Sequence, residues 1–191
     1  SRTLNTLMVR HESLRTVFVH GQDGAEVLQC ILPIEEFLLV KKDISNLSGA
    51  DQQEVLGGAL HEATQRRFDL EHGPLIRGEL IRLSGREHVL FVSMHHIVSD
   101  GWSMGVLTRE LAALYEAFSQ GQENPLPALP IQYVDYAQWQ RQWLSGERLE
   151  RQVAFWKEEL SGAPSLLELP TDHPRPQVQR YEGSAIPFEL D

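Results

Sequence analysis

Residues 93–103 read SMHHIVSDGWS; an apolar run ends in this stretch and an amphipathic run follows it. The first run predicts a strand and the second a helix. Asp100 has a short side chain and Gly101 permits backbone angles that other residues avoid, so together they turn the chain and start the helix at Trp102 or Ser103. Two histidines and an acid at such a junction form either a polar loop or an active site, and the rest of the chain decides between them.

The composition is that of an ordinary soluble globular protein. The chain has 191 residues, 41% hydrophobic and 23% charged, which fits one domain or one large lobe. Its net charge of −10 repels phosphate backbones, so we expect no nucleic-acid partner. No apolar run approaches the roughly 18 residues of a membrane span, so we expect no membrane association. Cys30 is the only cysteine, which excludes an internal disulfide and makes a cytoplasmic protein the simplest interpretation.

Strands and helices are mixed along the chain without strict βαβ alternation. The run HVLFVSM at 88–94 is apolar at nearly every position, which predicts a central strand buried on both faces. The predicted class is therefore α+β, a mixed-sheet α/β sandwich. Helices are predicted from the start to about residue 12 and near 51–68, 104–120, 133–144 and 149–160, and strands near 14–20, 25–32, 37–40, 75–83 and 88–94.

Apolar and aromatic side chains repeat at helical spacing in the last three predicted helices. Each set falls on one face, so each predicts a buried stripe. The favoured interpretation of the tryptophans is core packing, because aromatic side chains bury large areas. The helix that opens at Tyr133 is accordingly interpreted as a packing element. The first two stripes consist of Leu107, Leu111, Leu114, Tyr115 and Phe118, and of Tyr136, Trp139 and Trp143, and Trp156 belongs to the third.

Three catalytic interpretations of the histidine motif compete with a purely structural one. A Ser-His-Asp triad would use Ser99, which lacks the glycine-flanked elbow of such nucleophiles. A metal site would need His95, His96 and Asp100 together, but successive side chains at a strand end diverge and no HExxH spacing exists, so we expect no metal. The third is a single histidine that accepts a proton from a substrate nucleophile, for which a pKa of about 6.5 is suited.

Five stretches, in order, resemble the condensation domains of nonribosomal peptide synthetases, which belong to the chloramphenicol-acetyltransferase-like superfamily. The stretch HHIVSDG at 95–101 matches the HHxxxDG signature of that family. The others are RHESLRTVF at 10–18, FDLEHGPLIR at 68–77, YVDYAQWQ at 133–140 and LPTDHPRP at 169–176, which resemble RHExLRTxF, FDLxxGPLxR, YxDYAxWQ and LPTDxPRP. Ordered matches across nearly the whole chain make coincidence implausible.

The resemblance implies a chloramphenicol-acetyltransferase-like lobe, one half of a V-shaped pseudodimer. Residues 1–163 are expected to form the N-terminal lobe without its first strand, and 164–191 an extended crossover with the start of the next strand. The C-terminal lobe is expected to be absent. Since the active channel of the family lies between the lobes, we expect the 191-residue chain alone to be inactive or nearly so. We also expect the uncovered apolar surface to favour self-association of the fragment.

The resemblance further implies peptide-bond formation between two carrier-bound thioesters, in which the acceptor amine attacks the donor thioester. His96 is expected to face the channel and to accept the amine proton or hold the amine in line. His95 is expected to support the site by packing in the interior. Asp100 is expected to pair with Arg15, with Arg10 as a second candidate, and so to hold the loop of His96.

The remaining motif residues receive roles from the same resemblance. Gly101 is expected to allow close backbone approach near the reacting groups. Trp102 and Ser103 are the candidates for the substrate channel. The domain itself is expected to bind no cofactor, because the phosphopantetheine arm comes from the upstream and downstream peptidyl carrier proteins. An adenylation domain in the same polypeptide and a role in antibiotic or siderophore biosynthesis are also implied.

Two other functions fit part of the sequence. One is another acyltransferase of the superfamily, which would use a soluble acyl thioester and would share HHxxxDG. The other is a non-catalytic lobe that docks carrier proteins. Intact His96, Asp100 and Gly101 argue against the second, and the matches outside HHxxxDG favour the condensation domain over the first.

Overall fold

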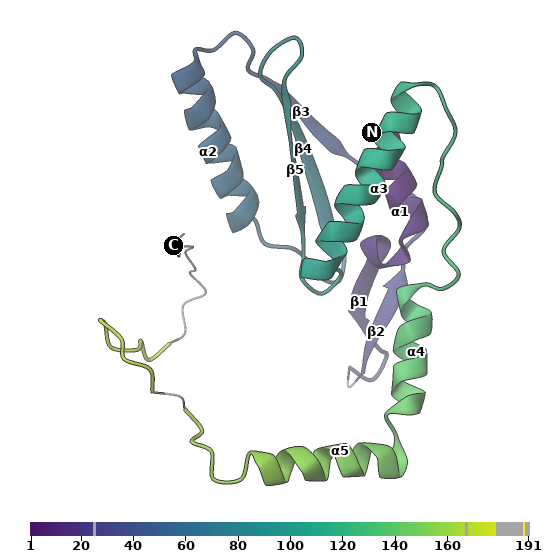
Figure 1. Cartoon of the computed structure of the whole chain (residues 1–191), viewed down its shortest axis with the longest axis vertical. Coiled ribbons are helices and arrows are strands. Elements are labelled where there is room, and N and C mark those ends of the chain that lie inside the picture. The colour runs from purple at the N-terminus through teal and green to yellow at the C-terminus, as the bar shows by residue number, and fades with distance from the viewer. Residues whose placement is uncertain (25, 167, 179–188, 190–191) are drawn as a thin grey trace. The chain divides into compact units, whose positions relative to one another are not determined.

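The computed structural model describes residues 1–24, 26–166, 168–178 and 189 (Figure 1). The chain divides into two compact units, Ser1–Trp143 and Leu144–Asp191. The histidine motif lies in the first unit, and helix α5 (Gly146–Glu159) lies in the second. Ala25, where the second strand was predicted to begin, and the strand start predicted at the end of 164–191 fall outside the described residues.

The helices of the first unit begin close to where the sequence predicts them. The second begins after Ser48, whose side chain accepts a hydrogen bond from the backbone N–H of Asp51 and so caps the helix. The strand predicted at 14–20 starts late, because its first residues form a short 3-10 helix. The bounds are α1 (Arg2–Arg10), η1 (Glu12–Arg15), α2 (Gly49–Gln65), α3 (Gly101–Ser119) and α4 (Tyr133–Trp143).

The strands form a hairpin and a mixed sheet. In the hairpin, β1 (Thr16–His20) pairs antiparallel with β2 (Val27–Ile31). The mixed sheet has the order β3-β4-β5, in which β4 runs parallel to β3 and antiparallel to β5. This combination of helices with a mixed sheet confirms the predicted fold class. The bounds of its strands are β3 (Leu39–Asp43), β4 (Ile76–Arg82) and β5 (His88–Met94).

Strand β4 runs through the core and is buried on both faces. Ile76 and Ile81 are five residues apart, so their side chains face opposite sides of the sheet. Ile76 packs with residues of α1 and α3, and Ile81 packs with Ala59 of α2. In Figure 1, α2 accordingly lies on one side of the sheet and α1 with α3 on the other. The buried members of the larger cluster are Leu4, Leu7, Leu14, Phe37, Ile76, Leu107 and Leu114.

Strand β5 is not the central strand that its apolar sequence predicted. Among the described strands it pairs only with β4, and its residues are at most half-buried. The doubly buried strand is β4, where Gly78 leaves room for the ring of Phe37. A Cβ at Gly78 would lie 2.8 Å from that ring, closer than carbon atoms approach.

The predicted buried stripe is formed only in part on α3 and is not formed on α4 or α5. Leu107 and Leu114 of α3 are buried, but Tyr115 is 70% exposed, because it is rotated by about 100° from Leu114 around the helix. Trp139 and Trp143 of α4 are exposed and stack on each other, with ring centroids 5.7 Å apart. These tryptophans therefore cover one another instead of the core. Trp156 of α5 is exposed as well.

A charged cluster joins α1 to α3. The Nε of Arg10 donates to both carboxylate oxygens of Glu110, at 3.0 and 3.1 Å, and the Nε2 of His11 lies 2.6 Å from the second oxygen. The guanidinium of Arg10 also donates to the backbone oxygen of Pro127. The side chains of Arg10 and Glu110 are only 11% and 13% exposed, so this ion pair is shielded from solvent. Loss of either partner would leave the charge of the other unpaired in the interior.

Replacement of Glu110 by alanine is expected to lower the free energy of unfolding by about 3 kcal/mol, the usual cost of removing one partner of a buried ion pair. Urea unfolding followed by circular dichroism measures this change. Glu116→Ala is the matched control, because Glu116 lies on the same helix and is exposed. Equal unfolding midpoints for the two variants would contradict a stabilising role of the cluster.

Candidate functional site

The histidine motif forms a tight turn between β5 and α3. The backbone N–H of His95 donates to the oxygen of Leu75 at 3.0 Å, which prolongs the pairing of β4 with β5 by one bond. The N–H of Val98 then donates to the oxygen of His95 at 3.1 Å and closes the turn. The chain leaves this turn through Asp100, the N-cap of α3. The turn therefore presents its side chains where a strand ends and a helix begins.

The two histidines have different surroundings. His95 is half-buried: its Nδ1 accepts a hydrogen bond from the backbone N–H of Ile97 at 3.0 Å. Its ring meets the ring of Phe68 edge-on, with centroids 5.9 Å apart. His96 is exposed and lies on the wall of a cavity. His95 thus holds the turn, and the imidazole of His96 is the one available to a substrate.

The cavity beside His96 has a volume of about 300 Å³. It lies where η1 and the β1-β2 hairpin meet the histidine turn and the start of α4. Its wall includes two carboxylates, several hydroxyls and an apolar part formed by Phe18, Ile31, Ile97, Val98 and Val134. The polar and charged lining residues are Glu12, Ser13, Thr16, Gln29, His96, Ser99, Asp100, Ser103 and Tyr133.

Asp100 and Ser103 form a reciprocal cap at the start of α3. The Oδ1 of Asp100 accepts from the backbone N–H of Ser103 at 2.8 Å and from its hydroxyl at 2.6 Å. The N–H of Asp100 in turn donates to the hydroxyl oxygen of Ser103 at 3.2 Å. The hydrogen bonds from Ser103, and to a smaller extent the nearby His96, hold the pKa of Asp100 below its usual value. Asp100 is therefore a carboxylate at neutral pH.

The predicted pairing of Asp100 with Arg15 is not formed between these two described residues. The guanidinium of Arg15 donates to the backbone oxygen of Leu32 at 2.6 Å and to Glu12 at 3.2 Å. The second candidate, Arg10, is bound to Glu110. Asp100 holds the turn through backbone and hydroxyl donors of its own helix instead, because a helix N-terminus supplies free N–H groups at short range.

The capping role of Asp100 makes the stability of the fold depend on pH. A folded-state pKa below that of the unfolded chain contributes stability above about pH 4, and this contribution is lost as pH falls through the folded-state pKa. In Asp100→Asn the cap is kept but the titrating group is removed. The urea midpoint of this variant is therefore expected to fall less between pH 5 and pH 2 than that of the natural sequence. Parallel midpoint curves would contradict this assignment.

The other motif residues divide between the cavity and the surface. Ser103 lines the cavity, whereas Trp102 is 85% exposed and is not part of its wall. Gly101 was predicted to permit close backbone approach near the reacting groups, and this stays a prediction; a Cβ at this position would meet nothing within 4 Å among the described atoms. Gly101 simply begins α3, so the space beside it is open. The structure brings His96, Asp100 and Ser103 together and leaves Trp102 outside.

Sequence analysis missed part of the wall. Glu12, Ser13 and Thr16 come from the RHESLRTVF stretch, and Tyr133 and Val134 come from the first turn of α4. The match at 133–140 was the available signal, but the helical spacing of its aromatic residues favoured packing over a site.

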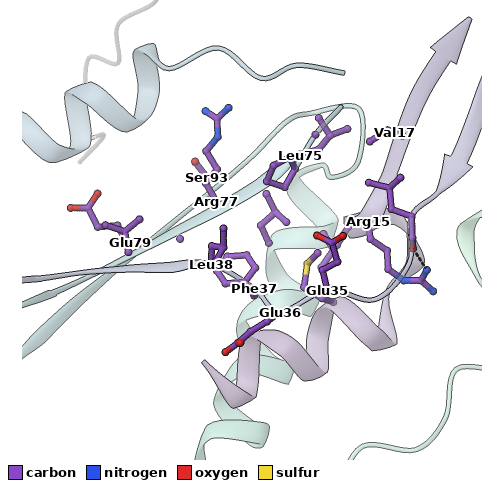
Figure 2. Close-up of a pocket in the computed structure, with 18 of the residues that line it drawn as sticks. Arg15, Val17, Glu35, Glu36, Phe37, Leu38, Leu75, Arg77, Glu79 and Ser93 are labelled. Carbon is purple, nitrogen blue, oxygen red and sulfur yellow. Dashed lines mark hydrogen bonds between the residues drawn. The ribbon is translucent and has the colours of Figure 1, made fainter. Parts of the chain in front are cut away.

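A larger cavity, of about 470 Å³, lies elsewhere in the first unit. Figure 2 shows Arg15 and Val17 at one end of it and Glu79 at the other. Phe37 and Leu75 contribute to its mainly apolar wall. Neither His96 nor Asp100 lines it. We therefore take the smaller cavity as the candidate site, because it contains the one exposed imidazole of the motif together with an ionised acid.

The described part of the chain offers neither a metal site nor a membrane-spanning helix. Within it, no group of three or more histidine, cysteine, aspartate or glutamate side chains is arranged to hold a metal ion. Every helix in the same ranges is too short or too polar to cross a lipid bilayer.

Comparisons with known proteins agree on one family. The model of the condensation domain family matches residues 1–191. A linear gramicidin synthase of Brevibacillus parabrevis is 49% identical over 183 residues, which are 96% of this chain and 2% of that protein. Malpinin synthetase of Mortierella alpina is 48% identical over 189 residues, 99% of this chain and 2% of that protein.

A solved structure shares the fold. The crystal structure of the X-domain from teicoplanin biosynthesis superposes with a TM-score of 0.78 at 35% sequence identity. The match covers 91% of this chain and 38% of the X-domain chain. The chain thus spans a small part of the curated relatives and about two fifths of this structural neighbour.

Proposed function

Because the chain belongs to the condensation domain family, we propose that its complete domain forms an amide bond between two carrier-bound thioesters. The amine of the acceptor attacks the thioester carbonyl carbon of the donor. A carbon–nitrogen bond forms, the carbon–sulfur bond breaks, and the proton lost by the amine ends on the departing thiolate. The acyl chain thereby moves to the acceptor carrier, and no acyl-enzyme intermediate is needed.

The single observation that carries this proposal is the position of His96. It is exposed at the wall of the cavity, at the end of a strand, and Asp100 four residues later is ionised. An imidazole there can take the proton of an incoming amine at neutral pH, or accept a hydrogen bond that holds the amine in line.

The proposal also covers the second lobe of the domain and the proteins with which the domain works. In this proposal residues 1–163 belong to the N-terminal lobe, residues 164–191 are the crossover toward a second lobe, and the channel lies between the two lobes. The partners are upstream and downstream peptidyl carrier proteins, whose phosphopantetheine arms bring the substrates, and an adenylation domain of the same polypeptide. A cytoplasmic location and self-association of the isolated lobe belong to the same proposal. The many exposed apolar side chains, such as Leu38 and Val178, support the last point.

The test uses the complete domain with one carrier loaded with a donor and one with an acceptor amino acid. Mass spectrometry of the intact acceptor carrier is expected to show the added acyl group. The 191-residue chain in place of the complete domain is expected to give no product. Product formation by the short chain would contradict the proposed two-lobe site.

A change of donor separates this function from that of a related acyltransferase. We expect a soluble acyl thioester, at the concentration of the loaded donor carrier, to react far more slowly than the carrier-bound donor. Equal rates would favour an acyltransferase that uses soluble thioesters. A complete domain that binds both carriers without forming product would favour a docking lobe.

A further inference from the structure

The first turn of α4 forms part of the wall of the His96 cavity. Tyr133 and Val134 line this cavity together with His96, although they are more than thirty residues away in the sequence. Tyr133 is 58% exposed, and its ring is tilted against the ring of Tyr136, with centroids 5.8 Å apart. The helix that was assigned to packing thus presents a phenol at the candidate site.

A glutamine clamp fixes this end of α4. The side-chain oxygen of Gln132 accepts from the backbone N–H of Glu12 at 3.1 Å, and its side-chain nitrogen donates to the backbone oxygen of Arg10 at 2.9 Å. The backbone N–H of Gln132 donates to the carboxylate of Asp135 at 2.8 Å, within the first turn of the helix. Since Glu12 itself lines the cavity, the clamp ties the start of α4 to another part of the same wall.

Most hydroxyl donors of the cavity are already engaged. Thr16 donates to the oxygen of Glu12 at 2.8 Å, Ser99 to the oxygen of His95 at 3.3 Å and Ser103 to Asp100 at 2.6 Å. Among the described residues, the phenol of Tyr133 and the much shorter side chain of Ser13 make no hydrogen bond. Among the lining hydroxyls that of Tyr133 combines a free donor, a long reach and a position fixed at its backbone.

We propose that Tyr133 is a substrate-contacting residue, whose phenol donates a hydrogen bond to a carbonyl oxygen of a carrier-tethered acyl thioester. This inference rests on the proposed function. A tyrosine hydroxyl suits a neutral carbonyl acceptor, whereas the carboxylates of Glu12 and Asp100 can only accept. Both the donor and the acceptor carry such carbonyl groups in their thioesters and arms. Tyr133 therefore helps to place one of them beside His96.

The test is Tyr133→Phe in the complete domain, with each loaded carrier varied separately. Loss of one hydrogen bond is expected to raise KM for one of the two carriers about fivefold, while kcat changes little. The carrier whose KM rises identifies the contacted substrate. Tyr136→Phe is the matched control, because the hydroxyl of Tyr136 already accepts from Gln140 at 3.2 Å on the same helix. Its KM values are expected to equal those of the natural sequence.

A second variant tests whether Tyr133 acts by contacting the substrate and not only by supporting the fold. Gln132→Ala removes the clamp and is expected to raise the same KM. In the double variant with Tyr133→Phe, the fold increase in KM is expected to be smaller than the product of the two single fold increases. Tyr133→Phe with unchanged KM for both carriers would overturn the inference. The proposed function would still hold in that case if the natural domain forms the amide and His96→Ala does not. A natural domain that forms no amide would reject the proposed function itself.

Discussion

Replacement of His96 by alanine is expected to slow amide formation by the complete domain at least about 100-fold, the lower end of what a positioned acid–base group contributes. The ring of His96 is the one exposed imidazole of the motif, and it lies on the cavity wall beside an ionised carboxylate. Its removal takes away the group that receives or positions the amine. The rate is measured in a single turnover with pre-loaded carriers, so that loading and release do not mask the chemical step.

His88→Ala is the matched control for this variant. His88 is an exposed histidine at the opposite end of the same strand, and it does not line the cavity. Its single-turnover rate is expected to equal that of the natural sequence. If His96→Ala also reacts at the natural rate, the assignment of the site is wrong.

Glutamine at position 96 separates the two roles of the histidine. A glutamine side chain can accept a hydrogen bond from the amine but cannot take its proton at neutral pH. If His96 holds the amine, His96→Gln is expected to recover part of the rate lost in His96→Ala. If His96 is a base, the glutamine variant is expected to be as slow as the alanine variant, and the pH dependence near the pKa of histidine is expected to disappear.

Replacement of Leu114 by alanine is expected to lower the free energy of unfolding of the chain by about 3 kcal/mol. The side chain of Leu114 is fully buried in the cluster that joins α1 and α3 to β4. The smaller side chain leaves a cavity that close-packed neighbours fill only in part. The change is measured by urea unfolding at constant protein concentration, because association of the chain would otherwise add to its apparent stability.

Leu38→Ala is the control for this change. Leu38 is 85% exposed, so its replacement is expected to change the free energy of unfolding by less than about 0.5 kcal/mol. A Leu114→Ala variant as stable as Leu38→Ala would mean that α3 does not pack on the sheet as described.

The local parts of the site could be predicted from the sequence. The turn at 93–103, a helix start within two residues of Gly101 (predicted at Trp102 or Ser103) and the different surroundings of the two histidines all follow from contacts between residues close together in the chain. A helix cap, a tight turn and the alternation of a strand are short-range effects, so the residues that cause them are next to each other in the sequence. The resemblance to a family then selected His96 among the chemical alternatives.

The long-range parts could not be predicted in the same way. Arg15 was expected beside Asp100, but it binds Leu32 and Glu12 instead. An arginine has several acceptors within reach, and its choice depends on how segments distant in the sequence meet. For the same reason, the helical spacing of Trp139 and Trp143 predicted a face but not what would cover it. The approach of Tyr133 to the His96 cavity also depends on such a distant contact, the clamp of Gln132.

The role of His96 is tested by a crystal structure of the complete domain with a stable analogue that links donor and acceptor. We expect an imidazole nitrogen of His96 to lie within about 3.2 Å of the nitrogen that stands for the acceptor amine. We also expect that Asp100 still caps α3 through Ser103. An analogue bound in the channel with its nitrogen out of reach of His96, and the ring packed against protein instead, would contradict this role of His96.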